Sequence, residues 1–256
     1  MPGGGNSSRH SLLRPCGTTA TKFETLHSWD LSPVQAVALQ RELAKQIDVR
    51  LPLTRCELIA GADISYNRFS SRFYAAVIVL RTDDCSVVEA QHAVRESPFP
   101  YVPGLLTFRE GPALLDAFAK VKSPVDAVMF DGQGIAHPRR LGLASHMGLW
   151  LKVPSIGCAK SLLTGHHKEP GEKAESVSPL LDHKEVIGEA VRTKDRTNPV
   201  YVSAGHLIDL PSSVRLVLQT CRGYRLPEPT RQAHLTVNEI RRQDGGGKGQ
   251  GELWPE

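Results

Sequence analysis

The sequence predicts an α/β protein built on one mixed β-sheet flanked by helices, and two patterns lead to that prediction. Three β-branched-rich segments, at 58–66, 73–81 and 85–95, are separated by only a few turn-like residues. Connections so short join antiparallel neighbours, so we expect a three-stranded antiparallel meander. Short apolar runs then alternate with helical patterns, which is typical of parallel strands added to the same sheet.

The remaining elements follow from periodicity and from turn residues. A helix is predicted over 34–46, with Ser32 as its N-cap and Pro33 at its first position. A proline-bounded loop over 98–104 leads into a helical pattern that ends near Val121. Further strands are predicted over 125–130, 155–159 and 199–203, and helices over 143–151, 212–220 and 231–242. Residues 165–184 are polar and contain Pro170, Gly171 and Pro179, so we interpret them as an irregular surface insertion.

Composition limits the class of protein. The chain has 256 residues, 40% hydrophobic and 23% charged, and a net charge of +4, which permits a polyanionic partner without requiring one. We expect a disordered tail over 1–27, a single catalytic domain over 28–243 and a flexible tail over 244–256. A transit peptide is the weaker alternative for the first tail, which is rich in Gly, Ser and Thr and has no acid before Glu24.

The cellular location and the oligomeric state are predicted from the length of the apolar runs and from the cysteines. The apolar run that ends at Leu80 is far shorter than the ~18–20 residues of a membrane helix, so no membrane association is expected. The five cysteines are odd in number and widely scattered, which favours a reducing compartment, and we expect a cytoplasmic monomer.

Two acids follow or interrupt apolar strand patterns. Asp63 lies inside the apolar segment 59–65, and an unpaired buried carboxylate costs several kcal/mol, so Asp63 needs a cation or a strong partner. The alternative, local hydrogen bonding at a strand end, is equally favoured by Asp63 alone. Asp131 follows the run 125–130, at the strand end where ligands gather in α/β sheets. Asp131 and Gly132 also fit an ordinary turn.

Glu110 is the third acid. Helical spacing places it in the middle of an apolar stripe with Leu106, Leu114 and Ala117. Thr107 and Glu110 also have the spacing of a capping box, and Pro112 suits a first helical turn. From spacing alone the capping interpretation is slightly favoured.

Together the three acids can converge on one edge of a mixed sheet, as a Mg²⁺ or Mn²⁺ site requires. Such a site activates water and neutralises phosphate charge. Lys160, just past strand 155–159, can add a cation there or be an ordinary solvated lysine. His234, expected at a helix start, can orient water or reach a metal, and a surface or capping role is equally favoured.

Six sequence words in order resemble the endonuclease V family, the deoxyinosine 3′ endonucleases with an RNase H-like fold. The words span residues 57–242 and are Gly-Ala-Asp63-Ile-Ser-Tyr, Pro100-Tyr101-Val102-Pro103-Gly, Phe-Arg-Glu110, Asp131-Gly-Gln-Gly-Ile-Ala-His137-Pro-Arg, Gly-Cys-Ala-Lys160-Ser and Arg-x-Ala-His234. The resemblance implies a divalent-metal site at Asp63, Glu110 and Asp131, binding Mg²⁺ with Mn²⁺ able to substitute. It implies catalytic assistance from Lys160 and His234, and a place for His137 at the DNA-binding site.

The resemblance also implies how a lesion is recognised and cut. Pro100, Tyr101, Val102 and Pro103 would form a wedge inserted beside an extruded hypoxanthine. Cleavage would fall at the second phosphodiester 3′ to the deaminated base and leave 5′-phosphate ends. Two alternatives stay open: a ribonuclease acting on inosine-containing RNA, and a non-catalytic inosine-binding module, which would not need three acids.

Overall fold

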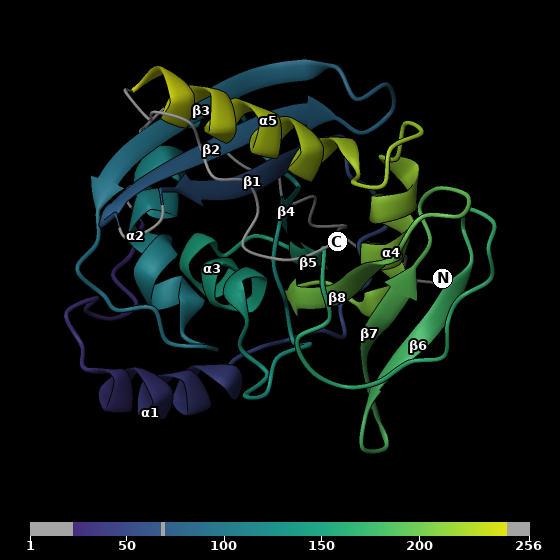
Figure 1. The fold of residues 1–256 in the computed structure, drawn as a ribbon, viewed down its shortest axis with the longest axis horizontal. Coiled ribbons are helices and arrows are strands. Elements are labelled where there is room, and N and C mark those ends of the chain that lie inside the picture. Colours follow the sequence, from purple (N-terminus) through teal and green to yellow (C-terminus); the bar gives the residue numbers. More distant parts are fainter. Residues whose placement is uncertain (1–22, 68–69, 245–256) are drawn as a thin grey trace, which may run out of the picture.

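The structure is a computed structural model that describes residues 23–67 and 70–244. Its central feature is an eight-stranded mixed sheet in the order β3-β2-β1-β4-β5-β8-β7-β6 (Figure 1). β1 (Leu58–Tyr66), β2 (Arg72–Arg81) and β3 (Val87–Glu96) form an antiparallel meander. β4 (Ala127–Phe130) and β5 (Ser155–Ala159) continue the sheet in parallel with β1. The predicted RNase H-like sheet is confirmed, meander and parallel strands together.

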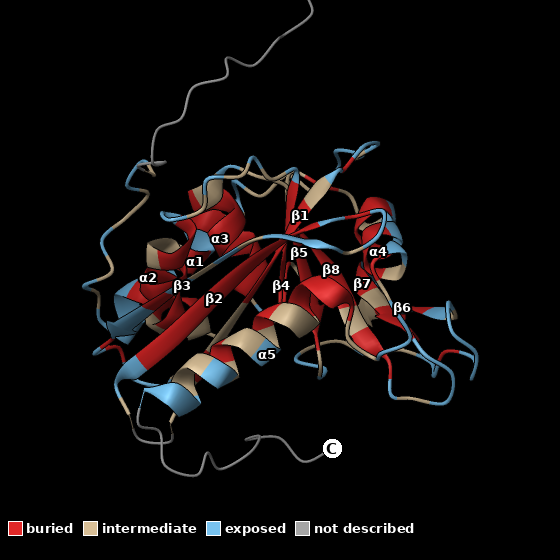
Figure 2. Ribbon diagram, turned by 90° about the horizontal axis from the view of Figure 1, so that it is seen from above, coloured by how far each residue is buried: buried red, intermediate tan, exposed pale blue. Residues whose placement is uncertain are grey.

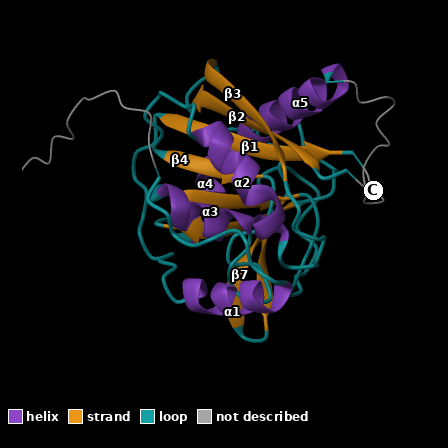
Figure 3. Ribbon diagram, turned by 90° about the vertical axis from the view of Figure 1, so that its left-hand side faces the viewer, coloured by secondary structure: helices purple, strands orange, loops and turns teal. Residues whose placement is uncertain are grey.

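Helices cover both faces of the sheet (Figures 1 and 3). On one face, α2 (Leu106–Phe118) and α3 (Leu143–Leu151) pack on Ala60 and Ala62 of β1 and on their neighbours. On the other, α4 (Leu210–Gln219) and α5 (Glu228–Gln243) pack on β8 (Val200–His206) and on the meander. Figure 2 shows the buried strands between these two layers. Successive side chains of a strand face opposite layers, so the β1 residues at odd positions, Asp63 among them, face α5.

α1 (Pro33–Ala44) forms as the sequence predicts. Ser32 is the N-cap, Pro33 is the first helical residue, and Gln35 completes a capping box by accepting a hydrogen bond from the Ser32 N–H at 2.8 Å. Ala36 packs with Phe99, Leu105 and Phe108, so α1 lies against the segment that leads into α2.

The interpretation of residues 165–184 as an irregular insertion is wrong. β6 (Val177–Asp182) lies inside this segment and forms a hairpin with β7 (Glu185–Val191), which pairs with β8. Pro179 argued against a strand, but β6 is the edge of the sheet, where one side of the backbone needs no partner. Arg192 holds the preceding loop by donating a hydrogen bond to the Pro170 carbonyl at 2.9 Å.

Two helix starts also differ from the prediction. α2 begins at Leu106 with Leu105 as N-cap and no side-chain capping bond, so the Thr107–Glu110 capping box is wrong. Thr107 and Glu110 are instead buried. α5 begins at Glu228 rather than Arg231, which places His234 in the second turn of the helix rather than at its start.

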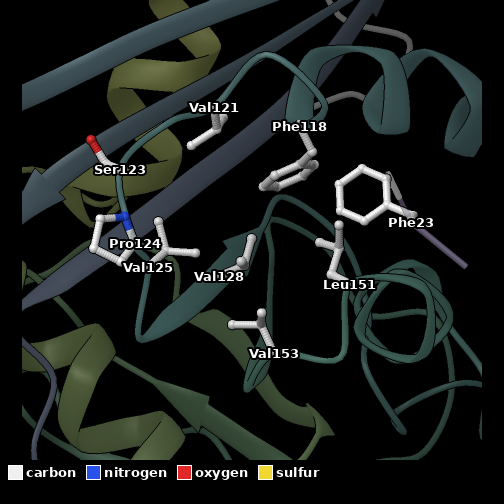
Figure 4. A pocket seen from close by; sticks show the side chains of 9 residues that line it. All are labelled: Phe23, Phe118, Val121, Ser123, Pro124, Val125, Val128, Leu151 and Val153. Atoms are coloured by element: carbon white, nitrogen blue, oxygen red, sulfur yellow. The ribbon is translucent and has the colours of Figure 1, made fainter. Parts of the chain in front are cut away.

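The end of the predicted N-terminal tail packs against the domain. Residues 1–22 lie outside the described part, but Phe23 lines an apolar pocket with Phe118, Val128 and Leu151 (Figure 4). His27 lies 2.7 Å from His146, Nε2 to Nε2. Residues 23–27 therefore belong with the folded part of the chain. The described residues include no helix with the length and apolarity that a membrane span requires.

Candidate active site

Asp63 and Asp131 lie side by side because of strand register. β1 and β4 pair in parallel up to Ala62 and Phe130, and the Asp131 N–H donates to the Ala62 carbonyl at 3.2 Å. Asp131 is therefore the next residue in register, beside Asp63, at the point where β4 ends. Burial raises the pKa of Asp131, and the neighbouring Asp63 carboxylate raises it further.

His234 reaches this pair from α5. Its Nδ1 donates a hydrogen bond to Asp63 Oδ2 at 2.8 Å. Gly61, two residues before Asp63 and on the same face, lets the first turn of α5 lie directly on β1: a Cβ at Gly61 would be 1.9 Å from the Pro229 carbonyl oxygen. Close packing of α5 on β1 thus brings His234 to Asp63.

Lys160 completes the group of polar side chains. It follows β5, the strand beside β4, and its Nζ lies 2.8 Å from Asp131 Oδ2 and 3.4 Å from His234 Nδ1. The ammonium lowers the pKa of Asp131, opposing the effects of burial and Asp63. Lys160 is thus an ion-pair partner rather than an ordinary solvated lysine.

Glu110 approaches from the opposite layer. It lies in the second turn of α2 and is only 6% exposed. Burial raises its pKa to about 8, with further contributions from Asp63 and Asp131, whereas Arg109 opposes the rise. The three acids are therefore neighbours, but Glu110 does not belong to the tightest cluster.

That cluster fits a divalent cation. One ligand atom each from Asp63, Asp131 and His234 lies within 4.8 Å of the other two. Carboxylate oxygens are the ligands that Mg²⁺ and Mn²⁺ prefer. Burial and, to a smaller extent, repulsion between the acids raise the pKa of Asp131 and Glu110, and a bound dication would offset both effects. The donor set and its electrostatics both indicate a metal centre.

The predicted wedge, Pro100 to Pro103, lies in the loop formed by residues 98–104, here called the wedge loop. Phe99 is buried among Ala36, Leu105 and Phe108, whereas Tyr101 is 53% exposed. The guanidinium of Arg109, next to Glu110, lies 5.9 Å from the centre of the Tyr101 ring. A buried neighbour thus anchors the loop and leaves the tyrosine presented to solvent.

His137 is buried and contacts the end of the wedge loop. Its Nε2 donates to the Gly104 carbonyl at 3.1 Å, and its Nδ1 accepts from the Arg139 N–H at 3.1 Å. Burial, helped by Arg139, lowers its pKa to about 4. The His137 ring is therefore neutral at pH 7, with its proton on Nε2.

Sequence reasoning missed Asn238. It lies one turn after His234 on α5, and its Nδ2 is 3.2 Å from His234 Nε2, while Ser65 of β1 donates to its Oδ1 at 2.9 Å. Asn238 Nδ2 also lies 3.4 Å from His234 Nδ1, so Asn238 contacts both nitrogens of the ring and restrains its orientation. The available signal was the i, i+4 spacing from His234.

The fold and the acidic cluster define the chain as a nuclease of the RNase H-like class. The family model for endonuclease V matches residues 41–235. An endonuclease V of Myxococcus xanthus is 50% identical over 218 residues, 85% of this chain and 93% of that protein. The endonuclease V structure from Streptomyces avermitilis is 36% identical, with a TM-score of 0.81, and the match covers 85% of this chain and 96% of that one.

A more distant structure has DNA bound. Endonuclease V of Ciona intestinalis, 24% identical with a TM-score of 0.70 over 82% of this chain and 98% of that one, was solved with a DNA containing an inosine followed by a ribo-adenosine. The chain belongs to the endonuclease V family and is an enzyme, an endonuclease.

Proposed function

We propose that the protein is a Mg²⁺-dependent endonuclease that cleaves the second phosphodiester 3′ to deoxyinosine in DNA, leaving 3′-hydroxyl and 5′-phosphate ends, with Mn²⁺ able to replace Mg²⁺. The convergence of the Asp63 and Asp131 carboxylates, with His234 within 4.8 Å of both, carries the proposal: the two acids are metal ligands and the His234 imidazole lies beside them. The cleavage position and the products rest on the family resemblance.

Asp63, Asp131 and Glu110 would hold the metal. A bound divalent ion lowers the pKa of its water and neutralises charge on the phosphate undergoing in-line displacement. Glu110 contributes from the second turn of α2, where its burial keeps the carboxylate away from bulk water.

Lys160 and His234 would act on the scissile phosphate. Their side chains are 33% and 32% exposed, so both reach a substrate while still contacting the acids. Nδ1 of His234 donates to Asp63 and its Nε2 faces the Asn238 amide, so an attacking water would have to displace that amide before Nε2 could accept its proton. The Lys160 ammonium can donate to a non-bridging phosphate oxygen.

Lesion recognition would depend on the wedge loop. Two prolines restrict the backbone around Tyr101, so the exposed ring is presented at small entropic cost. Inserted beside the lesion, the ring would offset the stacking lost when hypoxanthine is extruded. His137 would then lie at the DNA-binding site. The Ciona relative, solved with a DNA strand in which a ribo-adenosine follows the inosine, supports inosine as the recognised base.

The test is a cleavage assay on matched DNA and RNA strands, each with and without one inosine. We expect nicking of inosine-containing DNA only, requiring Mg²⁺ or Mn²⁺ and stopped by a chelator. Cleavage of the RNA strand alone would favour a ribonuclease. A mobility shift of inosine-containing DNA without nicking in Mg²⁺ would indicate a non-catalytic binding module.

The same proposal includes the setting of the enzyme. Cysteines 56, 85, 158 and 221 are all free thiols, which supports a reducing, cytoplasmic compartment. We propose that the enzyme acts as a monomer, and sedimentation at micromolar concentration measures this directly.

A further inference from the structure

A glutamine lies at the centre of the buried face of α1. The helix turns Ala36, Gln40 and Leu43 inward, and Gln40 is only 1% exposed. A buried amide is costly unless its donors and acceptor are all satisfied, so the partners of Gln40 indicate what this position does. None of the sequence motifs that define the site includes it.

Gln40 connects two loops. Its Nε2 donates to the Gly104 carbonyl at 2.9 Å and to the Leu141 carbonyl at 3.1 Å, and its Oε1 accepts from Arg139 Nε at 2.6 Å. Gly104 ends the wedge loop. Arg139 and Leu141 belong to residues 131–141, here called the lesion loop, which begins at the site carboxylate Asp131. One side chain thus bridges the loop that carries Tyr101 and the loop that carries Asp131.

The Gly104 carbonyl is a shared anchor. It accepts from Gln40 Nε2, from His137 Nε2 at 3.1 Å and from Arg139 Nη2 at 2.8 Å. Gly104 has a φ of +77°, and a Cβ there would lie 2.6 Å from Arg139 Nη2. The turn directly after Pro103 is therefore held by donors from both α1 and the lesion loop.

We propose that Gln40 is a positioning residue for lesion recognition, holding the wedge loop and the lesion loop at a set separation so that Tyr101 inserts beside the lesion. This inference rests on the proposed function. Without Gln40, His137 and Arg139 still contact Gly104, but α1 no longer contacts either loop through this amide, and Arg139 Nε loses its acceptor.

The test compares Gln40→Met with Gln35→Met in the full chain. Methionine matches glutamine in length but forms none of the three hydrogen bonds. Gln35 is on the same helix and completes its capping box, so its replacement weakens α1 without reaching either loop. Both variants carry Asp131→Asn, so that the DNA stays intact during binding.

Two readouts separate positioning from stability. The first is the ratio of Kd values for undamaged and inosine-containing duplexes. The second is the fluorescence of a 2-aminopurine placed beside the inosine, which rises when its neighbour unstacks. We expect Gln40→Met to lower the ratio about 10-fold, or ~1.4 kcal/mol, and to reduce the fluorescence rise. Gln35→Met should leave both readouts at the Asp131→Asn values while lowering the melting temperature.

The outcomes are distinct. If Gln40→Met lowers the melting temperature but keeps the ratio and the fluorescence rise, Gln40 is merely structural and the inference fails. If Gln40→Met does not fold, Gln40→Glu decides by the same ratio, because it keeps an acceptor for Arg139 and removes both donors. If the parent chain itself does not discriminate inosine, the proposed function fails whatever the variants do.

Discussion

Replacing Gly61 with alanine tests how close packing of one helix builds the active site. The new Cβ would lie 1.9 Å from the Pro229 oxygen and 2.1 Å from its carbonyl carbon. Both are backbone atoms, so no side-chain rotation relieves the contact. The first turn of α5 is itself held in place, because the Glu228 N–H donates to the Thr220 carbonyl at 2.9 Å.

The size of the effect follows from these distances. Ordinary contact between non-bonded atoms begins near ~3.5 Å, so α5 must move by about 1.5 Å or β1 must distort. Overpacking of this kind costs about 1–3 kcal/mol of unfolding free energy. A shift of even ~0.5 Å takes the 2.8 Å bond between His234 and Asp63 past the usual limit for a hydrogen bond. We therefore expect cleavage to fall at least ~10-fold, equivalent to about 1.4 kcal/mol in the barrier.

The assay combines denaturant unfolding with cleavage of an inosine-containing duplex. Gly171→Ala is the matched control, since its Cβ would approach only Ser176, whose hydroxyl lies 2.9 Å away and can rotate aside. The control should match the parent in both measurements. If Gly61→Ala unfolds and cleaves like the parent, α5 does not depend on this close approach and the argument is refuted.

Four further predictions concern the metal, the wedge, the salt response and pH. Asp63→Asn or Asp131→Asn keeps the shape of the side chain but removes its charge. Nicking should therefore fall by orders of magnitude, while binding of inosine-containing DNA largely survives. Near-normal cleavage by Asp131→Asn would exclude the metal assignment. Tyr101→Ala should weaken binding to inosine-containing duplex by about 1–3 kcal/mol, with a melting temperature near that of the parent. A sharp fall in melting temperature with an unchanged preference for inosine would mean that the exposed ring has a structural role instead. With a net charge of +4, binding should weaken with salt at a log–log slope of roughly −3 to −5, and a flat response would mean that phosphate contacts contribute little. Because burial lowers the pKa of His137 to about 4, the unfolded state binds more protons between that value and about 6.5, so the parent should lose stability as pH falls through this range. His137→Gln should not show the part of this stability loss that comes from protonating His137. If the stability of parent and variant falls in parallel between about pH 6.5 and pH 4, the lowered pKa of His137 is contradicted.

Local sequence patterns were sufficient to predict the helices and strands whose interacting partners are close in sequence. The meander follows from short turns, and α1 follows from Ser32, Pro33 and its apolar stripe, because hairpins and helix caps are satisfied by neighbours along the chain. The hairpin of β6 and β7 was missed because its polar sequence and Pro179 are tolerated only at a sheet edge, and edge position is a property of the assembled sheet.

For the site, the sequence by itself identified the candidate residues, since a carboxylate inside or directly after an apolar strand, as at Asp63 and Asp131, needs a cation or another strong partner if it is buried. Only the tertiary structure decided their geometry. The parallel register of β1 and β4 sets the two acids side by side, and Gly61 admits α5 with His234. It also decided that Glu110 is a buried acid rather than a helix cap. Strand register, helix approach and burial are set by contacts between segments far apart in the chain, and no local window of sequence contains both partners.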